Sequence, residues 1–246
     1  SGGLHRLRGG VGYRINEMLS VGATADLLFG IIESRRRTQW PNTQALRDVV
    51  VSDGVQLSGL TGTLGAHLAL ADVLSNDDAL SVGASVTLPA SLSGERYRTL
   101  DEDLARDTLS VQRGDVTLPW TGRLGVSYQP NARWSFVLDG LFEPWSTFST
   151  SFSSQDSAPT APAGFPVGGT STLADRWRLS GGAEVVPAGT DNLAGYFAQV
   201  AYRFGGYVEH MYVRPDEQTD LYEFAATAGV SLPTSLAGTR IDLNTV

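Results

Sequence analysis

Polar and apolar residues alternate along this chain in long segments, and these segments come in pairs joined by short turns. The turns contain Asn, Asp, Gly and Pro, the residues whose backbones suit tight reversals. The sequence therefore predicts five β-hairpins, or ten antiparallel strands. The five turns are centred on Ile15-Asn16-Glu17, Ser75-Asn76-Asp77-Asp78, Pro130-Asn131, Ala188 to Asn192 and Pro233-Thr234-Ser235.

Four longer polar stretches separate these hairpins. Residues 33–53, 90–119, 147–174 and 205–219 are rich in Ser, Thr, Asp, Gly and Arg, and we expect them to be loops. Short turns at one end of a barrel and long loops at the other are typical of outer-membrane proteins, in which the long loops face outward from the cell. The same orientation is expected here.

The alternation separates two faces of the predicted sheet. Within residues 121–129, Leu124 and Val126 point to one side, whereas Arg123 and Ser127 point to the other. The same holds along the other segments, so that one face is apolar and the other carries charge. The apolar, outward face is expected to include Leu124, Val126, Phe136, Leu179 and Val200.

A soluble antiparallel sandwich would also alternate. Three features favour a membrane barrel instead. The segments are about 9–13 residues long, near the length that a tilted strand needs to cross a bilayer, whereas soluble strands are nearer 5–6 residues. Aromatic residues gather near segment ends, as interfacial girdles require. Glycine is frequent within the strands, which weakens a soluble sheet but suits a curved barrel wall. The fold class is therefore all-β, an antiparallel transmembrane β-barrel.

Composition narrows the function. The chain of 246 residues has 41% hydrophobic residues and a net charge of −8, and this negative charge argues against nucleic acid as a partner. The chain contains no run of about 18 uncharged apolar residues, so the sequence does not predict a transmembrane helix. Cysteine is absent, which excludes disulfides, thiol catalysis and thiolate metal sites.

The two ends of the chain differ from those of a typical outer-membrane barrel. Ser1-Gly2-Gly3 is not a signal peptide, and Val246 stops within an alternating segment. We therefore expect residues 1–246 to form a single barrel domain that is an interior portion of a longer chain.

Several motifs occur in an order that resembles one family. The run Leu118-Pro119-Trp120-Thr121-Gly122-Arg123-Leu124-Gly125-Val126-Ser127-Tyr128-Gln129-Pro130-Asn131 is followed by Trp134-Ser135-Phe136-Val137-Leu138-Asp139 and then by Trp145-Ser146-Thr147-Phe148. Further matches are Gly12-Tyr13-Arg14-Ile15-Asn16, Arg176-Trp177-Arg178-Leu179-Ser180-Gly181-Gly182, Tyr202-Arg203-Phe204-Gly205 and Arg240-Ile241-Asp242-Leu243. Together these motifs are similar to the FadL family of outer-membrane transporters for long-chain fatty acids and other hydrophobic compounds.

This resemblance implies a barrel of about fourteen strands, about ten of them visible here, in the outer membrane of a Gram-negative-type bacterium. It also implies an N-terminal hatch in the lumen and ligand release through a kink in the wall. No hatch-like segment precedes residue 4, so hatch gating is not assigned to any residue of this sequence. The implied partners are the lipid bilayer, lipopolysaccharide and a hydrophobic small molecule, and no cofactor is implied.

Charged residues on the inward face have two interpretations. They can form Arg–carboxylate pairs between neighbouring strands that stiffen the wall. Alternatively, one or two unpaired arginines bind the carboxylate of a fatty acid, because a guanidinium grips a carboxylate in bidentate fashion. For the second interpretation the candidate ligand-binding residues are Arg123, Arg178 and Arg203 for the head group and Phe197, Val137, Leu141 and Leu28 for the tail.

An enzyme is not expected. No Gly-x-Ser-x-Gly elbow is present, and His67 lies alone on the inward face without the spacing of a zinc site. The cluster Asp101-Glu102-Asp103 could bind calcium or bridge lipopolysaccharide, or it could be a solvated loop.

Two other non-enzymatic functions stay open. One branch of the family resembles the barrel partner of the type IX secretion machinery. The chain could accordingly be a partner or anchor subunit of a secretion or surface-assembly complex, with a protein bound over its outer loops. A general diffusion porin is less favoured, because charges of both signs and an inward Phe197 suggest a filled lumen.

Overall fold

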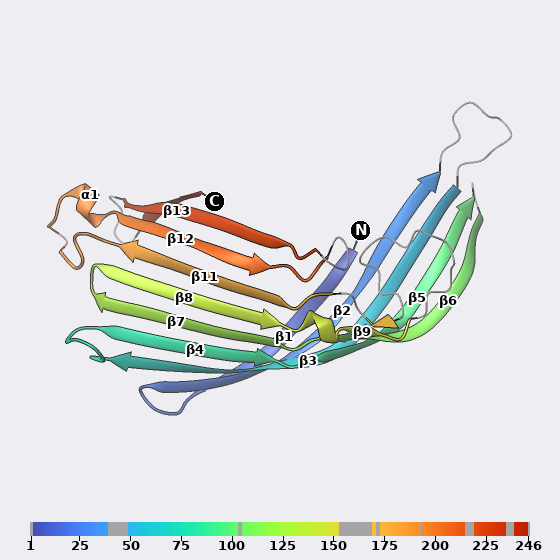
Figure 1. Ribbon diagram of the computed structural model, residues 1–246, viewed down its shortest axis with the longest axis horizontal. Coiled ribbons are helices and arrows are strands. Elements are labelled where there is room, and N and C mark those ends of the chain that lie inside the picture. Colours follow the sequence, from blue (N-terminus) through green and yellow to red (C-terminus); the bar gives the residue numbers. More distant parts are fainter. Residues whose placement is uncertain are drawn as a thin grey trace.

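The structure, a computed structural model, describes residues 2–38, 49–102, 105–152, 169–170, 173–191, 193–214, 219–234 and 239–245. These residues form one antiparallel sheet of fourteen strands, curved as a wall (Figure 1). No helix among them is long and apolar enough to cross a membrane. The fold is thus the antiparallel β-barrel type that the sequence predicts.

Ten strands build the wall in the order in which the sequence predicts them. They are β1 (Gly2–Arg14), β2 (Leu19–Thr38), β3 (Val49–Ala71), β4 (Ala79–Thr87), β7 (Thr121–Asn131), β8 (Trp134–Glu143), β11 (Arg176–Val185), β12 (Ala201–His210), β13 (Tyr222–Pro233) and β14 (Arg240–Thr245). Each of the five expected hairpins is present, pairing β1 with β2, β3 with β4, β7 with β8, β11 with β12 and β13 with β14.

Two of the expected loops are largely strands. Residues 33–38 and 49–53 extend β2 and β3, and most of 90–119 forms a hairpin of β5 (Ala90–Glu102) and β6 (Ala105–Leu118). We call these extended parts of β2 and β3, together with β5 and β6, the wing. The loop assignment was wrong because high polarity was taken as a loop signal. In the wing, ion pairs between neighbouring strands take the place of apolar alternation, for example Arg98–Asp53 at 3.2 Å and Arg113–Glu95 at 2.8 Å.

The remaining expected loops are mixed. Residues 205–210 belong to β12, and 147–174 contains the two-residue strands β9 (Ser149–Thr150) and β10 (Gly169–Thr170), after a single 3-10 turn at Trp145–Thr147. The part from 153 to 168 lies outside the described residues. Asp103 also lies outside the described residues, whereas Asp101 and Glu102 end β5.

Strand β3 forks the sheet. One of its edges pairs with β2 over twenty residues, from Thr38↔Val49 to Leu19↔Leu68. Its other edge is shared: Thr63–Ala71 pairs with β4, and Val49–Leu60 pairs with β5. The wall continues from β4, whereas the wing rises from β5 and diverges from the wall (Figure 1).

The apolar core lies at this fork. Leu28 of β2, Leu57 of β3, Leu92 of β5 and Val116 of β6 are all buried, and Phe152 closes the cluster with no exposed surface. Phe152 lies on Gly114 of β6, where an added Cβ would come within 2.8 Å of its ring. Leu28 was expected to line a ligand tail, but it instead packs in this core with side chains of β3, β5 and β6 and with Phe152.

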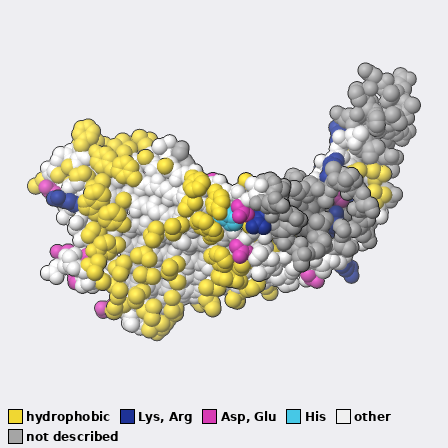
Figure 2. Space-filling model, in the orientation of Figure 1, with side chains coloured by type: hydrophobic (Ala, Val, Ile, Leu, Met, Phe, Trp, Pro, Cys, Tyr) yellow, Lys and Arg dark blue, Asp and Glu magenta, His cyan; other side chains and the backbone are white. Residues whose placement is uncertain are grey.

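The outward face of the wall is apolar as expected. Leu124, Phe136 and Leu179 are exposed on the side opposite to Arg123 and Ser180. Figure 2 shows hydrophobic side chains spread over this part of the molecule, with the visible charged ones mainly near its ends. Val200 is the exception: it precedes β12 and is buried, so its assignment as an outward strand residue was wrong.

The turn between β3 and β4 is held by one carboxylate. The backbone N–H groups of Val73, Leu74 and Ser75 donate to Asp78 at 2.6–3.1 Å. Burial opposes ionisation of Asp78, but these hydrogen bonds outweigh it and keep the pKa of its carboxyl below the ordinary value. The turn residues that the sequence points to are therefore built around an ionised aspartate.

The two faces of β7 give a direct test of the barrel wall. An arginine at Val126, in the middle of the outward face, should destabilise the folded protein in a bilayer by about 2–4 kcal/mol, because the charge would face hydrocarbon. The same change at the adjacent Ser127 places the arginine on the polar face and should cost much less. Unfolding by urea in lipid vesicles measures both, and equal costs would contradict the assignment of the faces.

The core at the fork predicts a second effect. Phe152→Ala should lower the free energy of unfolding by about 3–5 kcal/mol, since it removes a fully buried ring. Phe197→Ala serves as the matched control, because that ring is 76% exposed and its loss should change stability little. If the two variants unfold at the same urea concentration, the segment carrying Phe152 does not pack on the wing.

Candidate ligand-binding groove

The polar face of the wall holds an open groove of about 620 Å³ across β2, β3, β4, β7, β8 and β11. Glycines form much of its floor, because the register aligns them on neighbouring strands: Gly22 with Gly65, and Gly83 with Gly125. At Gly83 an added Cβ would meet nothing within 4 Å, so the volume above this residue is empty. The groove thus exists where side chains are missing from a row of the sheet.

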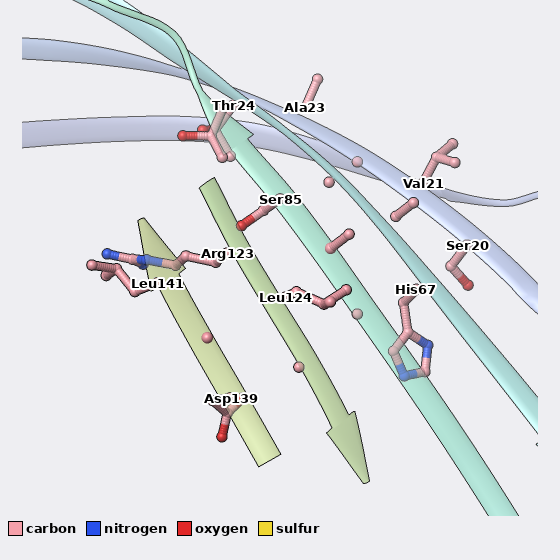
Figure 3. A pocket seen from close by; sticks show the side chains of 18 of the residues that line it. Ser20, Val21, Ala23, Thr24, His67, Ser85, Arg123, Leu124, Asp139 and Leu141 are labelled. Atoms are coloured by element: carbon pink, nitrogen blue, oxygen red, sulfur yellow. The ribbon is translucent and has the colours of Figure 1, made fainter. Parts of the chain in front are cut away.

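The charged or titratable side chains that line this groove are those of Arg123, Asp139, His67 and Arg178, and Figure 3 labels the first three. Arg123 lies on β7 directly opposite Leu141 of β8, and Figure 3 shows the two side chains next to each other. In the part of the chain that the structure describes, no ion pair or side-chain hydrogen bond involves Arg123. A cation beside an apolar side chain, above a floor without side chains, is suited to an amphiphilic anion.

The other two candidate arginines have partners. Arg203 bonds Glu184 through Nε at 2.5 Å and Asp242 through Nη1 at 3.2 Å. Arg178 lies 3.7 Å from Glu209, and its guanidinium stacks 3.8 Å above the ring of Tyr207. Arg203 therefore matches the bracing interpretation of the sequence, whereas Arg178 is held less tightly.

A second groove of about 550 Å³ adjoins the first. It is lined by Val137, Arg178, Arg203 and Tyr207, and Arg178 lines both grooves. Val137 and Leu141 lie on the polar face together with Asp139, as expected from their spacing on β8. The two grooves follow one another along the same face of the sheet.

Phe197 does not lie in either groove. Residues Tyr196–Gln199 form the short helix α1 in the β11–β12 turn, so the expected strand over 193–204 begins only at Ala201. The assignment of Phe197 as an inward strand residue was wrong. The side chains from Gly195 to Gln199 alternate in type by chance, and these residues lie in a turn. The Ala188 N–H donates to the Ala198 carbonyl at 2.7 Å and closes this turn instead.

A buried ion-pair network lies at the wing end of the wall. Arg176 donates to Glu143 at 3.0 Å and to Glu209 at 2.7 Å, and Glu143 also accepts from the indole of Trp145 at 3.0 Å. The carboxylate of Glu209 is almost fully buried. At the other side of the wall, Arg8 makes a bidentate pair with the fully buried Asp26 at 2.7 and 2.8 Å. Such pairs are the expected wall-stiffening network.

The glycine floor was missed by reasoning from the sequence. Gly83 and Gly125 are 42 positions apart and come together only through the β4–β7 register. The sequence does contain one signal, a glycine at the centre of several predicted strands, but it does not give the register that aligns them.

The structure is an antiparallel wall with an apolar outward face and a grooved polar face, which is the arrangement of a transmembrane β-barrel. Among protein families, the BamG family matches residues 1–245. The chain belongs to the BamG family.

The fold of this chain is similar to those of several solved structures. The CymD monoaromatic hydrocarbon channel is similar with a TM-score of 0.54 and 17% identity, over 95% of this chain and 65% of that one. The toluene transporters TbuX of Ralstonia pickettii and TodX of Pseudomonas putida have TM-scores of 0.45 and 0.48 and identities of 17% and 18%. TbuX is matched over 99% of this chain and 66% of its own, and TodX over 95% and 61%.

The chain therefore spans 61–66% of the length of these three proteins. The likeness to CymD supports the antiparallel β-barrel fold, and at this identity it bears on the fold alone. Among curated proteins, none matches the chain significantly.

The buried network predicts a third effect. Arg176→Ala should destabilise the protein by about 3 kcal/mol, because it leaves the buried carboxylate of Glu209 without its closest cation. Arg123→Ala is the matched control on β7, two strands away in the sheet, and it should leave stability nearly unchanged. Thermal unfolding followed by tryptophan fluorescence in detergent measures both variants, and equal melting temperatures would show that the network contributes nothing.

Proposed function

We propose that this protein is a barrel of the outer membrane of a Gram-negative-type bacterium that binds and transports hydrophobic compounds carrying an anionic head. The observation that carries this proposal is the glycine-floored groove with Arg123 beside Leu141. In this proposal the wing and the long connections face out of the cell, near lipopolysaccharide, and the short turns face the periplasm.

The division of labour follows from the contacts. Arg203 is already neutralised by Glu184 and Asp242, so it braces the wall. Arg123 has no such partner within the described residues, so its guanidinium is available for a carboxylate. Leu141 and the empty space above Gly83 accommodate an apolar tail.

The second groove extends the path. A ligand released from Arg123 next meets Arg178, which borders both grooves and is held by one ion pair at 3.7 Å and by the Tyr207 ring. Val137 lines the space beyond it. The proposed order of contact is therefore Arg123, Arg178 and then the region of Val137.

Two ligand classes follow. Long-chain fatty acids fit the Arg123 head site and are the class implied by the FadL resemblance. CymD is described as a monoaromatic hydrocarbon channel, so an aromatic hydrocarbon without a charged head is the natural comparison ligand. If binding depends on Arg123, the ligand belongs to the class of long-chain fatty acids.

The wing supports a second candidate function. It adds four long strand segments beyond the wall, and its outer strand β6 exposes Leu109 and Val111. A protein partner bound there would make the chain an anchor subunit of a secretion or surface-assembly complex. This function needs the wing and does not need the groove.

The proposal predicts that Arg123→Ala weakens binding of a labelled long-chain fatty acid about tenfold to a hundredfold, since a charge-assisted hydrogen bond contributes roughly 1.5–3 kcal/mol. Arg203→Ala should instead lower thermal stability and leave affinity nearly intact. The measurement is saturation binding to detergent-solubilised protein.

A second variant separates the groove from the charge. Gly83→Leu fills the open floor without a clash at Cβ, so it should abolish binding while the protein remains folded. If the parent protein shows no saturable binding of fatty acid or aromatic hydrocarbon, the proposed transport function is wrong and the partner-binding function is favoured.

A further inference from the structure

The turn between β11 and β12 exposes an unusual amount of apolar surface. Leu193 is 97% exposed, and Tyr196 and Phe197 of α1 are 51% and 76% exposed. The rings of Tyr196 and Phe197 meet edge to face at 5.8 Å and form one cluster. An exposed cluster of apolar side chains on a turn of this kind indicates contact with a membrane or with another apolar surface.

The cluster lies on the outward side of the wall. The Tyr202 hydroxyl donates to the Phe197 carbonyl at 3.2 Å. Tyr202 alternates with Arg203, which faces the grooved side, so Tyr202 points outward. Since Tyr202 reaches α1, the helix lies beside the outward face at the start of β12.

This position makes the cluster continuous with the apolar face of the wall. Trp134 and Tyr202 flank Val185 in the same row of the sheet, and the rings of Trp134 and Phe136 stack at 5.7 Å. Figure 2 shows hydrophobic side chains continuing to the end of the molecule at which Figure 1 places α1. The aromatic row and the turn therefore present one surface.

The turn also has a fixed shape and little charge. Its backbone is closed by the Ala188–Ala198 hydrogen bond, and the Gln199 side chain donates to the Ala194 carbonyl at 2.7 Å. Asp191 is the one charged residue between 186 and 200, and its carboxylate accepts the N–H of Leu193. By contrast, the β3–β4 turn carries Asp72, Asp77 and Asp78.

We propose that this turn is a membrane foot: Leu193, Tyr196 and Phe197 insert into the headgroup layer of the lipid leaflet that surrounds the short-turn end of the wall. Amphipathic rings and leucine are the side chains that this interfacial layer favours. The foot and the aromatic residues on the strands together fix the depth of the wall in the bilayer. This inference rests on the proposed membrane location of the protein.

The absence of cysteine from the chain allows a direct test. The full-length protein is reconstituted in phosphatidylcholine vesicles after single substitution with cysteine and labelling with an environment-sensitive fluorophore. Leu193→Cys and Phe197→Cys probe the foot, and neither side chain makes a hydrogen bond that the change would remove. Leu138→Cys, exposed on the outward face, is the lipid-facing control, and Asn76→Cys in the β3–β4 turn is the aqueous control.

The readout is quenching by lipids that carry a spin label either near the headgroup or, in separate vesicles, in the middle of the acyl chain. We expect the headgroup label to quench the Leu193 and Phe197 probes, the mid-chain label to quench the Leu138 probe, and neither label to quench the Asn76 probe. Quenching at Leu138 but not at either foot position would overturn the foot and leave the membrane location standing. No quenching at Leu138 would overturn the membrane location on which the foot depends.

A protein partner is the alternative occupant of this surface. In that case the foot probes would be shielded from iodide in the aqueous phase only when the partner is present, and the lipid quencher would have no effect. That result also contradicts the proposal.

Discussion

Strand β3 is the backbone element on which both halves of the structure depend. Successive residues of an antiparallel strand direct their backbone N–H and C=O groups to alternate edges of the strand. Strand β3 pairs one edge with β2 from Val49 to Leu68 and divides the other edge between β4 and β5. The division at residues 61–62 creates the wall and the wing from one strand. The Leu88 N–H, which donates to the Gly62 carbonyl at 2.8 Å, supplies a contact at the branch point.

The same strand also carries the change from a polar to an apolar interior. Thr63 and His67 of β3 line the groove, whereas Val55 and Leu57 on the same face of the strand are buried in the core. The alternation of side chains between the two faces of β3 is uninterrupted, and the difference lies in what packs on the face. The face is apolar where Val55 and Leu57 pack with side chains of β5, β6 and Phe152, and it is polar where it is open.

This explains what the sequence could and could not predict. Period-two alternation between Leu124 and Arg123, together with Asn and Pro at the turns, was sufficient for the ten wall strands and their two faces. It failed for β5 and β6, where ion pairs such as Arg98–Asp53 and Arg113–Glu95 join neighbouring strands, and for Phe197, which lies in a turn. Whether an arginine is free or paired also depends on register. Arg203 and Arg123 look alike in the sequence, but within the described residues only Arg203 pairs with carboxylates, Glu184 on the neighbouring β11 and Asp242 on β14.

The length of the β2–β3 ladder has a mechanical consequence. Twenty consecutive pairs at about 3.3 Å per residue span roughly 65 Å, about twice the hydrocarbon thickness of a bilayer. A force applied along this ladder loads its hydrogen bonds in shear, so that they resist together rather than one after another. The wing is therefore a stiff lever, and a load at its tip is transmitted along β3 to Thr63 and His67 of the same strand, which line the groove.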